Sequence, residues 1–207
     1  MAKDINKKMI IINTAEKLFY SIGINQTTMD KLAKESGFTK RTIYSYFDSK
    51  EDIHYEVLLK SFKKLNLYIK NKLAECSDIN GFDKIKLLGN CLIEFNKSNP
   101  QSFKAISDFQ NNDIERIIEN ETAVKCYEEG QYLVEIMQDC LNYGVNNNQL
   151  KDNIDVNKTF ILLWAVISGM INLINYKSEY IEKYMNENID GVLDYSYNLL
   201  SDCLKNN

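Results

Sequence analysis

Apolar residues recur three or four positions apart along almost the whole chain, which is the spacing of a buried helix face. Residues 8–22 show this spacing first, and Gly23 follows them as a left-handed helix cap. The same spacing predicts further helices near 50–75, 82–97, 100–111, 121–146, 156–176 and 188–205. Two of these have start signals, Pro100 at a first helical position and Asp155 as a cap. The pattern predicts an all-α fold.

Between residues 23 and 39 the apolar run is short and is bounded by capping residues. Thr27 with Asp30 three positions later matches a capping box, in which each side chain serves the other's backbone amide. The helix that this box opens turns Leu32 inward and ends at Gly37, whose backbone freedom suits a tight turn. We therefore expect a helix of about two turns followed by a sharp change of direction.

A second short helix follows at once. Thr39 is its predicted cap, the helix runs from Lys40 to Phe47, and Ile43 forms its inner face together with Phe47. Ser49 with Asp52 is another capping box and opens the long helix near 50–75. Two short helices joined by a turn of about four residues are typical of a helix-turn-helix.

Composition supports a helical protein without metal chemistry. Of 207 residues 44% are hydrophobic, and there is one proline with eight glycines, whereas β-rich folds need many turns. The five cysteines contain no CxxC pair and there is a single histidine, which predicts reduced thiols, no metal and no cofactor. The N-terminus lacks the apolar stretch of a signal peptide, so we expect a cytoplasmic protein.

The longest apolar stretch, Phe160 to Ile174, is shorter than the roughly 20 residues that a membrane-spanning helix needs. Ser168, Gly169 and Asn172 also interrupt it. We therefore expect a helix of a soluble protein, buried on nearly all sides, rather than a membrane span.

Charge is distributed unevenly along the chain. Residues 1–50 carry nine Lys and Arg against five Asp and Glu, while the whole chain has a net charge of −4. A positive N-terminal segment on an acidic chain is compatible with binding to phosphates, because binding depends on local neutralisation.

The second short helix has the features that a reader of duplex DNA needs. The major groove admits one α-helix, whose outward residues reach base edges and phosphates. The candidate contacts in and beside this helix are Thr27, Thr28, Thr39, Lys40, Arg41, Thr42, Tyr44, Tyr46 and Lys50. Arg41 either bonds to a guanine or contacts the backbone, and Tyr44 is either a phosphate donor or part of the core. Lys31 and Lys34 fit a solvated helix face.

Residues 8–55 resemble the DNA-binding domain of the tetracycline-repressor-like (TetR) family of bacterial transcriptional regulators. The resemblance rests on "LFYSIGINQTTMDKLAKESGFTKRTIYSYFDSKEDI", and above all on its Thr-Thr, Gly-Phe and Ile-Tyr-x-Tyr-Phe positions. It implies an all-α protein with a three-helix DNA-binding domain at 1–50 and a larger domain at 51–207. This larger domain would bind an effector and form a homodimer, and the dimer would read a palindromic operator in double-stranded DNA.

In the larger domain the resemblance implies a pocket for a small organic effector. Aromatic and other residues of the middle helices are candidates for it, although such residues at helical spacing also suit a core. The candidates for the pocket are Phe103, Phe109, Tyr127, Tyr132, Met137, Trp164 and Asn172. The last two long helices are candidates for the dimer interface through Ser168, Gly169, Val192, Tyr195 and Leu199, unless the apolar helix is only core.

The leading hypothesis is therefore a homodimeric repressor that a small effector releases from its operator. The alternative is a DNA-binding regulator under the control of a protein partner. An enzyme is disfavoured, because the chain contains no GxSxG, GxGxxG or P-loop motif and no second histidine.

Overall fold

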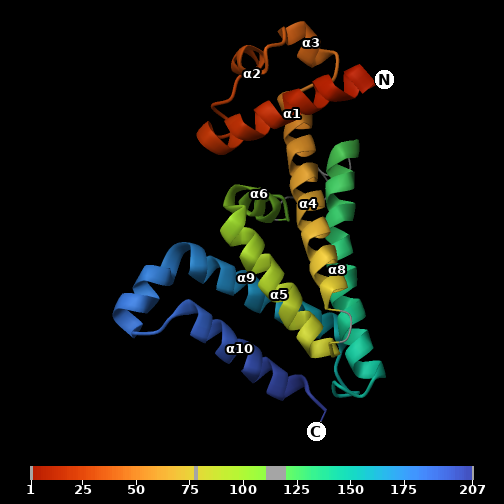
Figure 1. Cartoon of the computed structure of the whole chain (residues 1–207), viewed down its shortest axis with the longest axis vertical. Coiled ribbons are helices and arrows are strands. Elements are labelled where there is room, and N and C mark those ends of the chain that lie inside the picture. Colours follow the sequence, from red (N-terminus) through yellow and green to blue (C-terminus); the bar gives the residue numbers. More distant parts are fainter. Residues whose placement is uncertain (1, 77–78, 111–119, 207) are drawn as a thin grey trace. The chain divides into compact units, whose positions relative to one another are not determined.

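The computed structural model describes residues 2–76, 79–110 and 120–206 (Figure 1). Regular structure in this part of the chain is helical, apart from one isolated β-bridge between Leu150 and Lys205. The chain divides into two compact units. Unit 1 comprises residues 1–64 and 101–130, and unit 2 comprises residues 65–100 and 131–207. The all-α prediction is confirmed.

Unit 1 begins with three helices that pack around a common core. Helix α1 (Ala2–Ile22) contacts α2 (Met29–Ser36), which contacts α3 (Lys40–Tyr44), as Figure 1 shows in red and orange. We call these three helices the head. Their shared core consists of Ile11, Ile12, Ala15, Leu18, Phe19, Leu32, Ile43 and Phe47, with Ile53 and Val57. The predicted helix at 8–22 is longer than expected and starts at Ala2.

The turns of the head follow the sequence signals. Gly23 and Gly37 have φ angles of 83° and 74°, in the left-handed region that glycine adopts without strain. The amide of Gly37 donates to the carbonyls of α2, and α3 begins three residues later. Thr39 caps α3 as predicted, because its hydroxyl accepts the Thr42 amide at 3.1 Å.

Two local predictions in the head are wrong. Thr28, not Thr27, caps α2, and its hydroxyl accepts the Lys31 amide at 3.2 Å. Thr27 is turned inward instead, where its hydroxyl donates to the Gly23 carbonyl at 2.9 Å. Helix α3 ends at Tyr44 rather than Phe47, because the chain tightens into a turn there.

The first part of α4 (Lys50–Glu75) belongs to unit 1, where its Phe62 ring packs against that of Phe109. The predicted capping box at the start of α4 is confirmed, because Ser49 and Asp52 each accept the other's backbone amide. Asp52, the carboxylate of that box, also accepts the Asn120 amide at 2.7 Å. Asn120 in turn caps α8 (Glu121–Asn146). One carboxylate thus joins the starts of two helices.

A hydroxyl cluster joins α1 to α4 and α6 (Pro100–Gln110) in the same unit. The Tyr20 hydroxyl lies 3.0 Å from the Ser61 hydroxyl and 3.2 Å from that of Ser102. Ser61 also donates to the Val57 carbonyl at 3.1 Å. Both serines are buried, and the cluster therefore satisfies its own polar groups. The predicted helix at 100–111 begins at Pro100 as expected, and residue 111 lies outside the described residues.

Unit 2 contains α5 (Gly81–Ser98), α9 (Val156–Tyr180), a π-helical turn η1 (Ile181–Met185) and α10 (Ile189–Leu204), with parts of α4 and α8. Helix α9 packs on α5 and on α10 (Figure 1). Asp155 caps α9 as predicted, because its carboxylate accepts the Lys158 amide at 3.0 Å.

The expectation that the most apolar helix is buried on nearly all sides is wrong. Helix α9 with η1 is long and apolar enough to cross a membrane, by length and composition alone, and 28% of its most apolar stretch is buried. The inner face of α9, with the buried residues Leu163, Ile167 and Ile171, packs inside unit 2, where α9 contacts α5 and α10. The opposite face is exposed because, among the described residues of unit 2, α5 and α10 cover one side only.

Candidate nucleic-acid interface

Helix α3 has one face buried in the core of the head and the opposite face exposed to solvent. Ile43 is fully buried and Phe47 is 5% exposed, so the inner residues of the segment anchor it to the head core. Lys40 and Arg41 are exposed at its start, and Thr42 is half-buried. Tyr44 is 48% exposed, which excludes the reading of this residue as core. A short helix held in this way presents its first turn to solvent.

Two of the predicted threonines lie at helix starts. Thr28 and Thr39 are exposed, and each accepts a backbone amide with its hydroxyl at the N-terminus of α2 or α3. The Thr39 hydroxyl also lies 2.9 Å from that of Thr42. Helix N-termini attract anions through their free amides and the helix dipole. The arrangement therefore provides hydroxyl and amide donors beside the outward face of α3.

Two other predicted residues have partners inside unit 1. The Thr27 residue is 1% exposed, so its side chain has no outward surface to offer. The Lys50 ammonium donates to the carbonyls of Ile24 and Thr27, at 2.7 and 3.1 Å. These two bonds fasten the start of α4 to the loop before α2, and they leave the ammonium one further donor.

Tyr46 is half-buried, and its hydroxyl donates to the Asp4 carboxylate at 3.1 Å. Burial and this hydrogen bond raise the pKa of Tyr46 above its ordinary value, so the hydroxyl remains a donor at neutral pH. Sequence reasoning missed Asp4, because 42 residues separate it from its partner. It also missed the ion pair between Asp30 and Lys40 at 2.6 Å, because Asp30 had been assigned to a capping box.

The predicted effector residues are divided between the two units. Phe103, Phe109 and Tyr127 belong to unit 1, where Phe109 packs its ring edge against Phe62. The other four belong to unit 2, where Met137 is buried, Tyr132 and Asn172 are exposed, and Trp164 is half-buried and stacks on Phe160.

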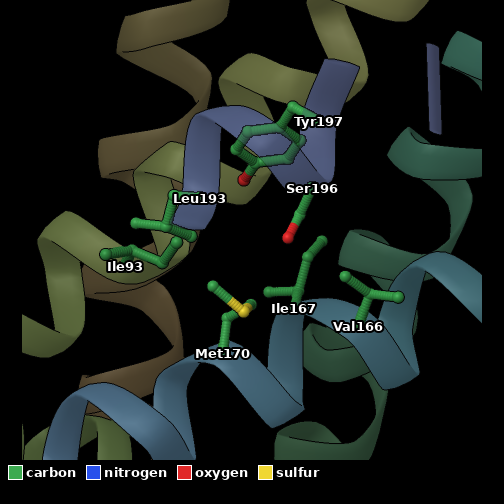
Figure 2. Close-up of a pocket in the computed structure, with 7 residues that line it drawn as sticks. All are labelled: Ile93, Val166, Ile167, Met170, Leu193, Ser196 and Tyr197. Atoms are coloured by element: carbon green, nitrogen blue, oxygen red, sulfur yellow. The ribbon is translucent and has the colours of Figure 1, made fainter. Parts of the chain in front are cut away.

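Unit 2 contains a cavity with a volume of about 10 Å³ between α5, α9 and α10. None of the predicted effector residues lines it (Figure 2). The assignment of an effector pocket to those residues stays a prediction.

The predicted interface residues lie on the outer sides of α9 and α10. Tyr195 and Leu199 are 69% and 54% exposed, Gly169 is exposed, and Ser168 and Val192 are half-buried. Further exposed apolar side chains on α9 and η1 extend the same kind of surface, namely Ile161, Leu162, Leu173, Tyr176, Tyr180, Tyr184 and Met185. Large exposed apolar patches mark interaction sites in soluble proteins.

Comparisons with known proteins agree with this geometry. Residues 11–57 match the bacterial regulatory proteins of the tetR family. An uncharacterized HTH-type transcriptional regulator of Bacillus subtilis, YhgD, is 40% identical over 63 residues. That match covers 29% of this chain and 33% of the relative, so it spans about one third of the relative's length.

Several solved structures match almost the whole chain, including the following two. A TetR/AcrR-family regulator from Thermobifida fusca has a TM-score of 0.69 at 22% identity, covering 95% of this chain and 97% of the other. FadR from Bacillus subtilis, in complex with stearoyl-CoA, has a TM-score of 0.68 at 19% identity, covering 93% and 97%. At these identities the structures establish the fold alone. The sequence matches show that residues 11–57 form the helix-turn-helix DNA-binding domain of TetR-family transcriptional regulators, and the chain as a whole has the fold of a solved regulator of that family.

Proposed function

We propose that the protein is a homodimeric repressor that binds a palindromic operator through α3 and is released from it by a small-molecule effector. The observation that carries the proposal is the arrangement of α3, anchored by Ile43 and Phe47 with Lys40, Arg41 and Tyr44 exposed. These are the residue types that bond to base edges and phosphates in the major groove.

The contact set that we propose contains Thr28, Thr39, Lys40, Arg41, Thr42, Tyr44 and Tyr46. Thr27 is left out because its side chain is buried. Lys50 enters only through its one remaining donor, since two carbonyls already hold its ammonium. Tyr46 reaches a phosphate by exchanging its bond to Asp4 for a bond to the nucleic acid.

Dimerisation supplies the second reading helix. One helix-turn-helix contacts few base pairs, and a two-fold dimer reads two half-sites roughly 34–36 Å apart. The exposed apolar residues of α9 and α10 favour pairing through these helices, in a four-helix arrangement between two copies. Gly169 supports close approach, because a Cβ added there would meet no atom within 4 Å.

Control by a small molecule is supported by the related fold of FadR, a regulator solved with stearoyl-CoA. Control by a protein partner is the competing possibility. Thermal-shift screening of the purified protein with organic compounds, beside a partner pull-down, separates the two. A repressor that no compound protects, but that loses its operator when a partner protein binds, would be of the second kind.

The DNA-binding proposal is tested with duplexes selected from a random library. The recovered operator should be palindromic, and its affinity should fall steeply with salt because binding releases counterions. Arg41→Ala should weaken binding by about 1–3 kcal/mol if the guanidinium reads a base. Lys34→Ala, which removes an exposed cation from α2, is the matched control and should change affinity little. Unchanged affinity and base preference in Arg41→Ala would remove Arg41 from the contact set.

The dimer proposal has its own test. Leu199→Lys places a charge on the exposed apolar face of α10 and should convert the dimer to monomer in analytical ultracentrifugation. Asn198→Lys makes the same charge change at an exposed neighbour and should leave the dimer intact. A dimer that survives Leu199→Lys would place the interface elsewhere.

A further inference from the structure

Two hydroxyl groups on α10 are buried without a hydrogen-bond partner in the part of the chain that the structure describes. They belong to Tyr197 and Ser201, and each of these residues is 5% exposed. Buried polar groups in native proteins are nearly always bonded, because an unmade hydrogen bond inside a protein lowers stability. The two hydroxyl groups lie one turn apart on the same buried side of α10. This side of the helix therefore has hydrogen-bonding capacity that the described residues do not use.

The Tyr197 hydroxyl occupies a place that only glycine leaves open. It lies over Gly89 of α5, and a Cβ added to that glycine would be 2.2 Å from the hydroxyl oxygen. Gly89 thus provides room for a phenol at this contact, but none of the residues that the structure describes bonds to the hydroxyl. Burial raises the pKa of Tyr197 to about 12, so the group remains an uncharged donor.

The cavity of unit 2 adjoins the same tyrosine ring. Figure 2 shows the side chains of α9 on one side of it and those of α10 on the other. The lining residues are Ile93, Val166, Ile167, Met170, Leu193, Ser196 and Tyr197. None of them carries a charge, and the Ser196 hydroxyl already donates to the Val192 carbonyl at 2.8 Å. A volume of about 10 Å³ has the size of one water molecule, but an apolar lining does not hold water well.

The polar links that hold α10 to α5 are weak. Lys86 pairs with Asp194 at 3.3 Å and Lys97 with Asp190 at 3.6 Å. Both carboxylates are largely exposed, and ion pairs of this kind contribute little to stability. A small outward shift of α10 would enlarge the cavity and bring the Tyr197 hydroxyl to its wall.

We propose that this cavity is the closed form of a binding site for a small uncharged molecule, mainly aliphatic, with one hydrogen-bond-accepting oxygen that the Tyr197 hydroxyl binds. We infer an aliphatic ligand because the cavity lining is mainly aliphatic. We infer one accepting oxygen because the Tyr197 hydroxyl is a donor without a partner among the described residues. A neutral ligand is favoured because none of the residues that line the cavity carries a charge, although the Lys86 ammonium lies 5.5 Å from the centre of the Tyr197 ring. The proposal rests on the proposed function in one respect, since the occupant would be the effector.

The test uses the full-length protein without DNA and four six-carbon probes, namely 2-hexanone, 1-hexanol, hexanoate and hexylammonium. Binding is measured by titration calorimetry and by the shift of the thermal transition. The two uncharged probes should bind and raise the transition temperature, and the two charged ones should not. Tyr197→Phe should weaken 2-hexanone binding about three- to tenfold, the effect of one hydrogen bond.

Ser201→Ala is the matched control, because it removes the other unpartnered hydroxyl of α10 from a residue outside the cavity lining. Its affinity for 2-hexanone should equal that of the wild type. Ile167→Phe fills the cavity and should abolish binding. This second variant keeps the site testable if Tyr197→Phe alters the fold. Equal binding by wild type and either cavity variant, or no binding by any uncharged probe, would overturn the site. Because binding is measured without DNA, failure of operator binding would count against the proposed function alone.

Discussion

The two units differ in the bonding of their buried hydroxyl groups. In unit 1 the hydroxyls of Tyr20, Ser61 and Thr27 and the ammonium of Lys50 all bond to neighbours within the unit. In unit 2 the Tyr197 and Ser201 hydroxyls have no partner among the described residues, and long apolar stretches of α9 are exposed. The bonded groups of unit 1 thus tie its segments to one another. In our proposals, a ligand and a second copy would cover the unpartnered hydroxyl of Tyr197 and the exposed apolar face of α9.

The largest expected effect on this comparison comes from Lys50. Lys50→Met keeps the aliphatic stem but removes both bonds to the carbonyls of Ile24 and Thr27. We expect the free energy of unfolding to fall by about 2 kcal/mol, because two hydrogen bonds from a charged donor are lost. Urea unfolding measures the change. Lys31→Met, on the exposed face of α2, is the control and should have little effect. An equal response of the two variants would mean that Lys50 is not a fastening residue.

A pair of identical substitutions tests the two units against each other. Ser61→Ala removes a bonded hydroxyl from unit 1 and should lower the free energy of unfolding by about 1 kcal/mol. Ser201→Ala removes an unpartnered one from unit 2 and should raise it by about 0.5–1 kcal/mol. Thermal unfolding of both variants gives the comparison directly. Changes of the same sign would refute the difference between the units.

The smallest expected effect is a dependence of stability on pH that belongs to unit 1. Burial against the α1 side of unit 1 lowers the pKa of His54 from 6.5, and Glu51 opposes this only in part. The unfolded chain then binds a proton at higher pH than the folded one does, so stability is full above pH 6.5 and falls as the pH decreases below it.

His54 is the only histidine of the chain, which makes the substitution a clean test. The wild type should lose stability between pH 7 and pH 5.5, and His54→Gln should lose less over the same range. The measurement is urea unfolding at several pH values. A variant with the same pH slope as the wild type would assign the dependence to carboxylates.

Local signals predicted the head well. Gly37, Thr39 and the pair Ser49–Asp52 act within three or four residues, and the structure contains the turn and both caps. The error at α2 arose because two threonines stand side by side and only Thr27 has an acidic residue three positions later. Packing decided the matter, since Thr27 faces the core and Thr28 is left to cap the helix.

Contacts between distant residues could not be predicted. The bonds of Tyr46 to Asp4 and of Asn120 to Asp52 join residues 42 and 68 positions apart, and no local pattern marks them. The exposure of α9 was hidden for another reason. A helix that packs in a core and a helix that pairs with a second copy need the same apolar residues, so composition does not distinguish them.

Trp164 makes unit 2 observable by tryptophan fluorescence. It is the only tryptophan in the sequence, and it lies half-buried on α9. Its ring stacks on that of Phe160, with 6.5 Å between the ring centres. Excitation at the red edge of the absorption band therefore samples unit 2 and is blind to the head. A change in emission on adding a hexane-chain probe, or on diluting the protein, would follow α9 in real time without any attached dye. Operator binding that leaves the emission unchanged would mark an event confined to unit 1.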